Sequence, residues 1–213
     1  MAKQQLIDAM SNLWKTKRKL IVSELSHEDG WDERIGWLKK VDPYKYDGTD
    51  EQVMEALLEE RYEDFMADFE SNADDADGDL MVYRCMTVND ADEFAFNIAN
   101  GLPADDYKGL GIYWSWKESA AQAHWGQGGE PVTIHALVPF GSINPLYTLT
   151  LNLSPALGED EAEIRLKPGA PLSVLGINLD DRNGDHYLSP LDDDLDPIRM
   201  SAGYPTVSKI LAD

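Results

Sequence analysis

The stretch Leu80-Met81-Val82-Tyr83-Arg84-Cys85 is where the hydrophobic pattern of this 213-residue chain changes from a helical to a strand-like period. Before it, apolar residues recur every three or four positions, as on one face of an amphipathic helix. After it, short apolar runs are separated by glycine, proline and asparagine, as in strands joined by turns. The sequence therefore predicts an α+β fold, in which an N-terminal helical segment precedes a core built on a mixed or antiparallel β-sheet.

The helical part contains two expected helices. The first follows an apolar stripe made by Leu6, Ile7, Met10, Leu13 and Trp14. Thr49 or Asp50 is placed to cap the second, whose apolar positions run from residue 53 to residue 69. The other face of this helix is nearly all Glu and Asp, which indicates either a solvated surface or an acidic patch that steers a basic partner. Residues 72–78 are expected to form a flexible connector.

The region that follows contains strand candidates and two short helices. Asn89 is placed to cap one helix, and Ser115 with Glu118 forms a capping-box pattern at the start of the other. The expected strands are residues 80–83, 111–114, 131–138, 146–153, 162–166 and 172–177. Because few helices separate these strands, antiparallel or mixed pairing is favoured.

The chain is strongly acidic, with 18 Lys and Arg against 40 Asp and Glu and a net charge of −22. A nucleic-acid-binding surface needs a basic footprint, so direct binding to nucleic acid is not expected. An anionic membrane surface is disfavoured for the same reason, whereas a protein partner with a basic surface fits the charge. The acidic excess is densest in residues 29–79, which carry 18 acidic and five basic side chains. This distribution divides the chain into an acidic helical segment at 1–79, a core at 80–178 and an acidic C-terminal tail at 179–213.

Several other classes of protein are not indicated. Cys85 is the single cysteine, which excludes a disulfide framework within the chain and a cysteine-rich zinc site. The four histidines show no metal-ligand spacing, so no metal is expected. Polar residues interrupt the N-terminal stretch where a signal peptide would be apolar, and every apolar run is far too short for a membrane-spanning helix. The expected location is a cytoplasm, that of the host cell if the chain is viral.

Three groups of residues are candidates for chemistry. Arg84 ends a strand expected to be buried, where an arginine needs an anionic partner. The side chains of Tyr113-Trp114-Ser115 alternate between the faces of a strand, so they cannot all point into one core. Glu161 and Glu163 share one face of a strand, where paired carboxylates have raised pKa values or stabilise a cationic transition state. Taken singly, each group also fits an ordinary structural role.

Taken together and in this order, the three groups resemble the motifs of the ADP-ribosyltransferase superfamily. Val82-Tyr83-Arg84 resembles the first-strand arginine of its Arg-Ser-Glu class. The string at 109–115, Gly-Leu-Gly-Ile-Tyr-Trp-Ser, is similar to the Gly-Ile-Tyr-Phe-Ala stretch of the poly-ADP-ribose polymerase side. Glu161-Ala162-Glu163-Ile164 resembles the Glu-x-Glu strand. The resemblance spans residues 80–178, and Tyr113-Trp114-Ser115 stands where the Arg-Ser-Glu class has Ser-Thr-Ser.

The resemblance implies a split β-sheet of the ADP-ribosyltransferase type and NAD as co-substrate. Glu163 would hydrogen-bond the ribose and stabilise the ribosyl cation, while Glu161 would orient or deprotonate the acceptor. Arg84 would hold the diphosphate or the nicotinamide ribose, and Tyr113 would stack on the nicotinamide. The residues expected to bind NAD are Arg84, Tyr113, Trp114 and Ser115.

The expected function is therefore mono-ADP-ribosyl transfer to a protein, with arginine as one candidate target residue. Two alternatives stay open. One is an NAD glycohydrolase on the same scaffold, with water as the acceptor. The other is a non-enzymatic acidic protein that mimics DNA and blocks a basic partner. The enzymatic interpretations require the arginine, the aromatic–hydroxyl strand and the glutamates to converge around one cleft.

Overall fold

The structure is a computed structural model that describes residues 1–27, 31–99, 110–123, 129–154, 162–180, 186–190 and 198–201. Its helices are α1 (Ala2–Leu25), α2 (Trp31–Val41), α3 (Asp50–Asn72), α4 (Ala91–Ala99), α5 (Glu118–Ala123), the short 3-10 helix η1 (Phe140–Ser142) and α6 (Pro145–Leu153). Its strands are β1 (Asp75–Ala76), β2 (Asp79–Val88), β3 (Tyr113–Ser115), β4 (Glu130–Val138), β5 (Glu163–Arg165), β6 (Pro171–Asp180), β7 (His186–Pro190) and β8 (Ile198–Ser201). The predicted α+β class, with helices at the N-terminus, is confirmed.

The strands described form one sheet in which every pair is antiparallel. Their order is β5-β3-β2-β4-β6-β7, with β1 beside β2 and β8 beside β6. The central pair is β2 and β4, which are in register from Leu80↔Val138 to Val88↔Glu130. Alternate residues of these two strands fill the core because they point to the same face. The fully buried ones are Leu80, Val82, Val132, Ile134, Ala136 and Val138.

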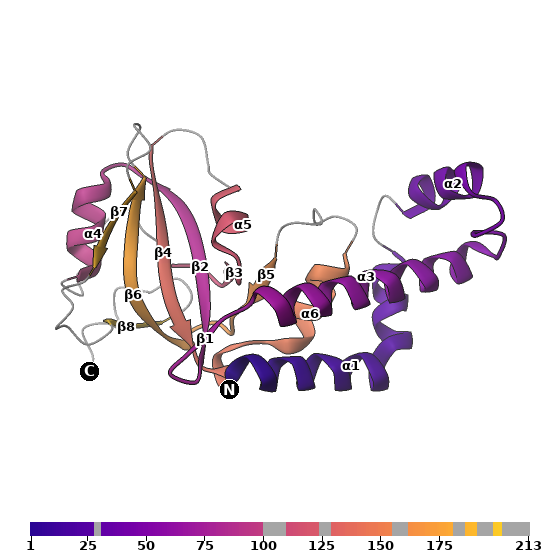
Figure 1. Ribbon diagram of the computed structural model, residues 1–213, viewed down its shortest axis with the longest axis horizontal. Helices are drawn as coiled ribbons and strands as arrows, with labels where there is room; N and C mark the ends of the chain where they lie inside the picture. Colours follow the sequence, from indigo (N-terminus) through magenta and orange to yellow (C-terminus); the bar gives the residue numbers. More distant parts are fainter. Residues whose placement is uncertain are drawn as a thin grey trace.

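The first three helices form an arm that leaves one side of the sheet. α1 and α3 run side by side, and α2 lies at their far end (Figure 1). Trp14 of α1 stacks on Tyr62 of α3 with ring centroids 4.7 Å apart. At the sheet end, the Ala2 N–H donates to the Gly78 carbonyl at 2.8 Å, and the rings of Phe69 and Trp116 meet at 5.1 Å. The arm and the sheet therefore share one continuous hydrophobic core.

The α3 cap follows the sequence signal. Thr49 accepts the Gln52 N–H through its side chain, and the Gln52 side chain accepts the Thr49 N–H in return. Such a reciprocal capping box satisfies two amide groups that a helix start leaves without partners. Most of the apolar positions after it are buried as expected, with Leu58 and Phe69 at 0% exposure, while Tyr62 and Met66 are half-buried.

The expected strand at 146–153 is wrong, because these residues form α6. Their alternating Leu and Thr pattern fits a strand, yet it also places Leu149 and Leu153 four residues apart on one helical face, and both are fully buried. The residues just before this segment decide between a strand and a helix. Asn144 caps the helix by accepting the Tyr147 N–H, and Pro145 occupies the first turn, where its missing N–H does no harm.

Two segments expected to be irregular contribute strands. The connector at 72–78 contains β1, which turns back onto β2 through Asp77 and Gly78, with φ angles of 53° and 91°. The region expected to be a C-terminal tail supplies β7 and β8, which both pair with β6. Short strands such as these carry a weak hydrophobic signal, and what places them in the sheet is pairing, with β2 for β1 and with β6 for β7 and β8.

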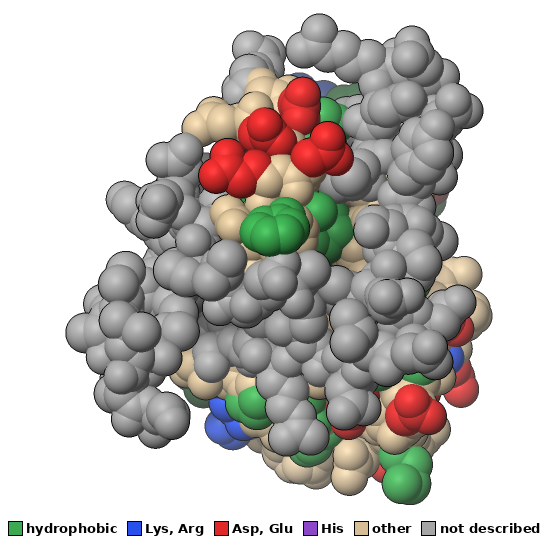
Figure 2. Space-filling view, turned by 90° about the vertical axis from the view of Figure 1, so that its left-hand side faces the viewer, with side chains coloured by type: hydrophobic (Ala, Val, Ile, Leu, Met, Phe, Trp, Pro, Cys, Tyr) green, Lys and Arg blue, Asp and Glu red, His purple; other side chains and the backbone are tan. Residues whose placement is uncertain are grey.

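A group of acidic side chains lies on the side of the molecule where α4 lies (Figure 2). Figure 2 shows acidic side chains gathered beside hydrophobic ones on this face. Asp92 and Glu93 occupy the first turn of α4, and Phe96 of the same helix is 61% exposed. Carboxylates in the first turn of a helix are stabilised by the helix dipole, so Asp92 and Glu93 also have a structural role at the start of α4. Among the helices described, none has a stretch long and apolar enough to cross a membrane.

Candidate functional site

The strands that carry the three sequence motifs are neighbours in the sheet. β5 carries Glu163, β3 carries Ser115 and β2 carries Arg84, in the order β5-β3-β2. Ser115 lies directly opposite Tyr83 on one side and Glu163 on the other. Groups that are far apart along the chain are therefore brought within a few strand widths of each other.

The strand register defines a set of side chains that we call the polar row: Glu163, Ser115, Tyr83 and His135. Each is paired with the next across β5, β3, β2 and β4. Paired residues of antiparallel strands project from the same face, with Cβ atoms about 5 Å apart. The row therefore presents a carboxylate, a hydroxyl, a phenol and an imidazole along one line of the sheet.

Arg84 starts from the opposite face, because it follows Tyr83 in an unbroken strand. Its Nη1 donates to the Tyr113 carbonyl of β3. The guanidinium lies so close to Gly111, whose φ is +71°, that a Cβ there would be 2.8 Å from the Arg84 Cζ. The motif strands are neighbours, but the register places the Arg84 and Glu163 side chains on opposite faces of the sheet, and neither residue is among those that line the two cavities described below.

Tyr113 and Trp114 differ sharply in exposure. Tyr113 is 44% exposed, and the Arg165 guanidinium stacks on its ring at 4.1 Å. Trp114 is 2% exposed, pairs with Ile164, and donates its indole N–H to the Gly111 carbonyl at 3.3 Å. Of the two aromatic residues predicted to bind NAD, Tyr113 therefore offers a ring at the surface, whereas Trp114 is part of the core.

The backbone of Glu163 is held by α6. The Asn152 side chain donates to the Glu163 carbonyl at 2.8 Å and accepts the Glu163 N–H at 3.1 Å. Two residues on, the Thr148 hydroxyl accepts the Arg165 N–H at 3.1 Å. These helix side chains supply the hydrogen bonds that a further strand would make, so β5 is not an open edge. Glu161, the other predicted catalytic glutamate, lies outside the described residues.

Ser115 links β3 to the helix that follows. Its Oγ accepts the Lys117 N–H at 3.1 Å, immediately before α5 begins at Glu118. The predicted helix is present, but its start differs from the predicted capping box, because Ser115 accepts the Lys117 N–H and the helix begins only at Glu118. The Ser115 hydroxyl thus has a structural contact as well as its place in the polar row. Ser115 is 4% exposed.

Sequence reasoning missed three residues of this region. Glu118 Oε1 lies 3.0 Å from His135 Nε2, and the His135 ring meets the Tyr83 ring edge-on at 5.0 Å. Burial raises the pKa of Tyr83, and the Glu118 and Asp74 carboxylates raise it further. The available signal was the position of His135 inside an otherwise apolar strand. A hollow of about 430 Å³ next to the row is lined partly by Tyr83 and Glu118.

In the part of the chain that the structure describes, His, Cys, Asp and Glu side chains form no group of three or more that could hold a metal ion. The polar row instead supplies groups that bind and polarise organic substrates: a carboxylate for developing positive charge, and hydroxyl and imidazole groups for hydrogen bonds. Comparison of the chain with protein-family models, with curated proteins and with solved structures gave no match.

Proposed function

We propose that the protein is a mono-ADP-ribosyltransferase, which uses NAD as co-substrate and modifies a protein. The observation that carries this proposal is the direct pairing of Ser115 with Glu163 on strands next to the one that bears Arg84. This pairing supports the proposal because the paired residues belong to the motifs through which the sequence resembles that superfamily. The antiparallel pairing of the described strands agrees with the mixed or antiparallel core that the sequence predicts, but these strands form one sheet, whereas the resemblance implies a split one.

In the proposed reaction, the bond between nicotinamide and ribose breaks and nicotinamide leaves with the bonding electron pair. The ribose then carries positive charge shared between C1 and the ring oxygen, as in glycoside cleavage. Glu163 stabilises this charge from a fixed position, because the Asn152 side chain binds both the N–H and the carbonyl of Glu163. A nucleophile of the target then bonds to C1 and loses its proton, a step in which Glu161 is the predicted base.

The remaining residues position the substrate in this proposal. Tyr113 offers an exposed ring for stacking on nicotinamide. Arg84 fixes the β3 backbone through the Tyr113 carbonyl, so it orients the strand that carries Ser115. The predicted contact of Arg84 with the diphosphate requires its guanidinium to extend past the end of strand β3, because the side chain starts from the other face of the sheet. The net charge of −22 suits a target with a basic surface.

The experiment incubates the purified chain with NAD labelled in its adenylate half, with and without a bacterial lysate. Label on a protein band shows transfer, whereas free ADP-ribose alone shows hydrolysis with water as acceptor. Glu163→Gln is expected to lower nicotinamide release about a hundredfold, because it removes the charge and nearly keeps the shape. Glu70→Gln, at an exposed position of α3, serves as the control.

Nicotinamide release by Glu163→Gln within about threefold of wild type would contradict the assignment of Glu163. Absence of both products with the wild-type chain would contradict the enzyme and favour the acidic binding protein that mimics DNA.

A further inference from the structure

The outer part of the helical arm, residues 15–45, differs in charge from the rest of the chain, and we call it the arm tip. It contains eight of the 18 Lys and Arg residues but only six of the 40 Asp and Glu residues. Its formal charge is therefore +2, whereas the rest of the chain carries −24. Four of its lysines are exposed and form no ion pair within the described part of the chain: Lys15, Lys17, Lys19 and Lys40.

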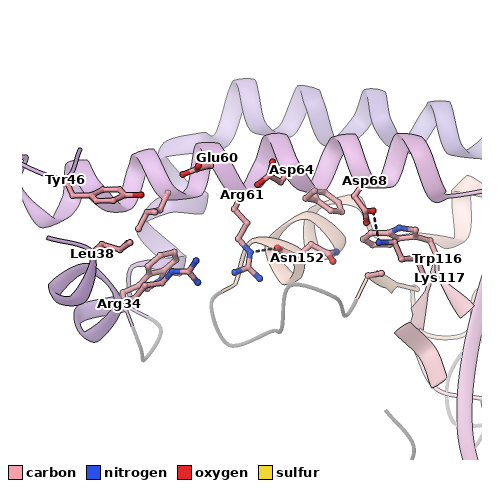
Figure 3. A pocket seen from close by; sticks show the side chains of 14 residues that line it. Arg34, Leu38, Tyr46, Glu60, Arg61, Asp64, Asp68, Trp116, Lys117 and Asn152 are labelled. Carbon is pink, nitrogen blue, oxygen red and sulfur yellow. Dashed lines mark hydrogen bonds and ion pairs between the residues drawn. The ribbon is translucent and has the colours of Figure 1, made fainter. Parts of the chain in front are cut away.

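Helix α2 of the arm tip has a buried side and an exposed side. On its inner side, Ile35 is 4% exposed and Leu38 lines a cavity of about 450 Å³ between the arm and the sheet (Figure 3). On its outer side, Trp37 and Val41 are 60% and 61% exposed, and their four-residue spacing places them next to each other. Tyr44, just after the helix, is 94% exposed. The arm tip therefore presents apolar surface as well as unpaired lysines.

This concentration of exposed apolar side chains is unusual within the molecule. Eight large hydrophobic residues are exposed in the described part of the chain, and four of them belong to the arm tip: Leu20, Trp37, Val41 and Tyr44. Single exposed apolar residues are ordinary, whereas a concentration of them flanked by charged residues is typical of a surface that binds another molecule. A partner that fits the arm tip needs an apolar group together with negative charge.

The opposite end of the molecule has this complementary character. Helix α4 lies on the side of the sheet away from the arm (Figure 1). Phe96 of this helix is 61% exposed, and Asp92 and Glu93 share its side of the helix because they lie four and three residues before it. Two more carboxylates are held at the start of α4, where the side chains of Asp90 and Glu130 accept backbone N–H groups of its first turn.

We call this set of side chains the α4 face: Asp90, Asp92, Glu93, Phe96 and Glu130. Its four carboxylates are exposed, and none of them forms an ion pair with another residue of the described ranges. Figure 2 shows acidic side chains gathered beside hydrophobic ones on this side of the molecule. The α4 face therefore combines an exposed aromatic ring with negative charge that the chain itself leaves unpaired.

We propose that the arm tip of one copy of this chain binds the α4 face of a second copy. In this contact the exposed side chains of Trp37 and Tyr44 pack against Phe96, and lysines of the arm tip pair with the carboxylates of the α4 face. The two surfaces lie at opposite ends of the long axis of the molecule, so the contact runs head to tail (Figure 1). Such a contact builds rings when its rotation closes and filaments when it does not.

The net charge of −22 does not prevent this contact. At physiological salt, repulsion between charges in solvent falls off over about 8 Å. Helix α3, with 23 residues, is about 35 Å long, so the arm keeps the acidic sheet of one copy several screening lengths from the next copy. The lysines and carboxylates at the contact itself are close enough to attract one another.

The test measures self-association of the full chain by sedimentation velocity at about 5 to 500 µM, a range that detects weak interfaces. We expect the sedimentation coefficient of the wild-type chain to rise with concentration. Trp37→Ser and Phe96→Ser should each weaken association at least about tenfold, because each removes a central aromatic side chain from one surface. Since each variant keeps the other surface intact, their mixture should form a heterodimer and nothing larger.

Two further variants separate the proposed contact from general effects. Tyr147→Ser, at a residue that is 57% exposed and outside both surfaces, is the matched control and should associate like the wild-type chain. Asp92→Asn combined with Glu93→Gln should weaken association about tenfold, although it makes the net charge less negative. If repulsion between copies controlled association, this double variant would instead associate more tightly. Thermal unfolding checks that each variant is folded, and the double variant replaces Phe96→Ser in the mixture if that variant is not.

A wild-type chain that is monomeric at every concentration would overturn the proposal, and so would a mixture of the two variants that stays monomeric. Loss of association in Trp37→Ser with wild-type association in Phe96→Ser would show that two arm tips bind each other, which also overturns it. Binding of a monomeric wild-type chain to vesicles that contain phosphatidylserine would assign the arm tip to a membrane instead. NAD cleavage plays no part in these measurements, so they test this contact separately from the proposed transferase function.

Discussion

Two rows of side chains cross the same part of the sheet one residue apart, and they differ in burial and polarity. The polar row consists of Glu163, Ser115, Tyr83 and His135. The row next to it, which we call the apolar row, consists of Ile164, Trp114, Ile134 and Ile177, each at most 2% exposed. Because side chains alternate along a strand, the two rows face opposite sides of the sheet.

The two rows have different roles: the apolar row stabilises the fold, and the polar row carries the groups that can take part in chemistry. The apolar row is core, and its contribution is the burial of hydrophobic surface. The polar row carries ionisable and hydrogen-bonding groups on a face that a hollow adjoins. Arg84 is the exception, since it projects from the apolar side and binds the backbone of β3. A strand shift of one residue would exchange the rows, so the register decides which residues are candidates for catalysis.

The largest effects are expected from a pair of substitutions one residue apart. Ile164→Ala should lower the free energy of unfolding by about 3 kcal/mol, because it empties space at a fully buried position. Glu163→Gln should change stability by less than about 1 kcal/mol and yet remove most NAD turnover. Urea unfolding and nicotinamide release measure the two quantities. Equal losses of stability in the two variants would show that the rows do not divide the roles.

A smaller effect on both quantities is expected from Asn152→Ala. It removes the two hydrogen bonds that hold the Glu163 backbone, so stability should fall by about 1–2 kcal/mol and NAD turnover about tenfold. The matched control on the same helix is Thr150→Ala, whose hydroxyl donates, within the described part of the chain, to carbonyls of α6 alone. Loss of stability without loss of turnover in Asn152→Ala would mean that the clamp does not position Glu163.

Much of the fold could be predicted from local patterns, because those patterns have local causes. The strand at Leu80, the cap at Thr49 and the helix that starts beside Ser115 all depend on residues within a few positions of each other. The strand predicted at residues 146–153 is wrong because one Leu–Thr pattern satisfies both periods, and Asn144 was not identified as a helix cap from the sequence.

The candidate site depends on long-range pairing, which local patterns do not specify. The sequence placed the motif residues on strands, and the structure brings those strands together. Which face each side chain occupies follows from the pairing of Tyr83, rather than Arg84, with Ser115. His135 entered the site through the same register, from a strand that the sequence predicted without a functional role. The cavity of about 450 Å³ between the helical arm and the sheet depends on the packing of three separate helices, α2, α3 and α6.

The smallest expected effect is on the titration of Tyr83 within the polar row. Its pKa should lie above the ordinary value of 10.0, because of burial first and the Glu118 carboxylate second. The folded state then favours the neutral phenol, so this contribution to stability is present below pH 10.0 and is lost as the pH rises through the folded pKa.

NMR of ¹³C-labelled tyrosine measures this pKa directly. Glu118→Gln should lower the pKa of Tyr83, whereas Glu93→Gln, on the exposed surface of α4, should leave it unchanged. A Tyr83 pKa that does not respond to Glu118→Gln would remove the electrostatic link within this part of the site.

The most direct test is to locate NAD in a crystal structure of the full chain carrying Glu163→Gln, which should slow cleavage enough to trap the substrate. We predict that the nicotinamide ribose lies over the polar row, within hydrogen-bond distance of the side chain at position 163. NAD bound away from that row, with its ribose on the Ile134 side of the sheet, would contradict the account.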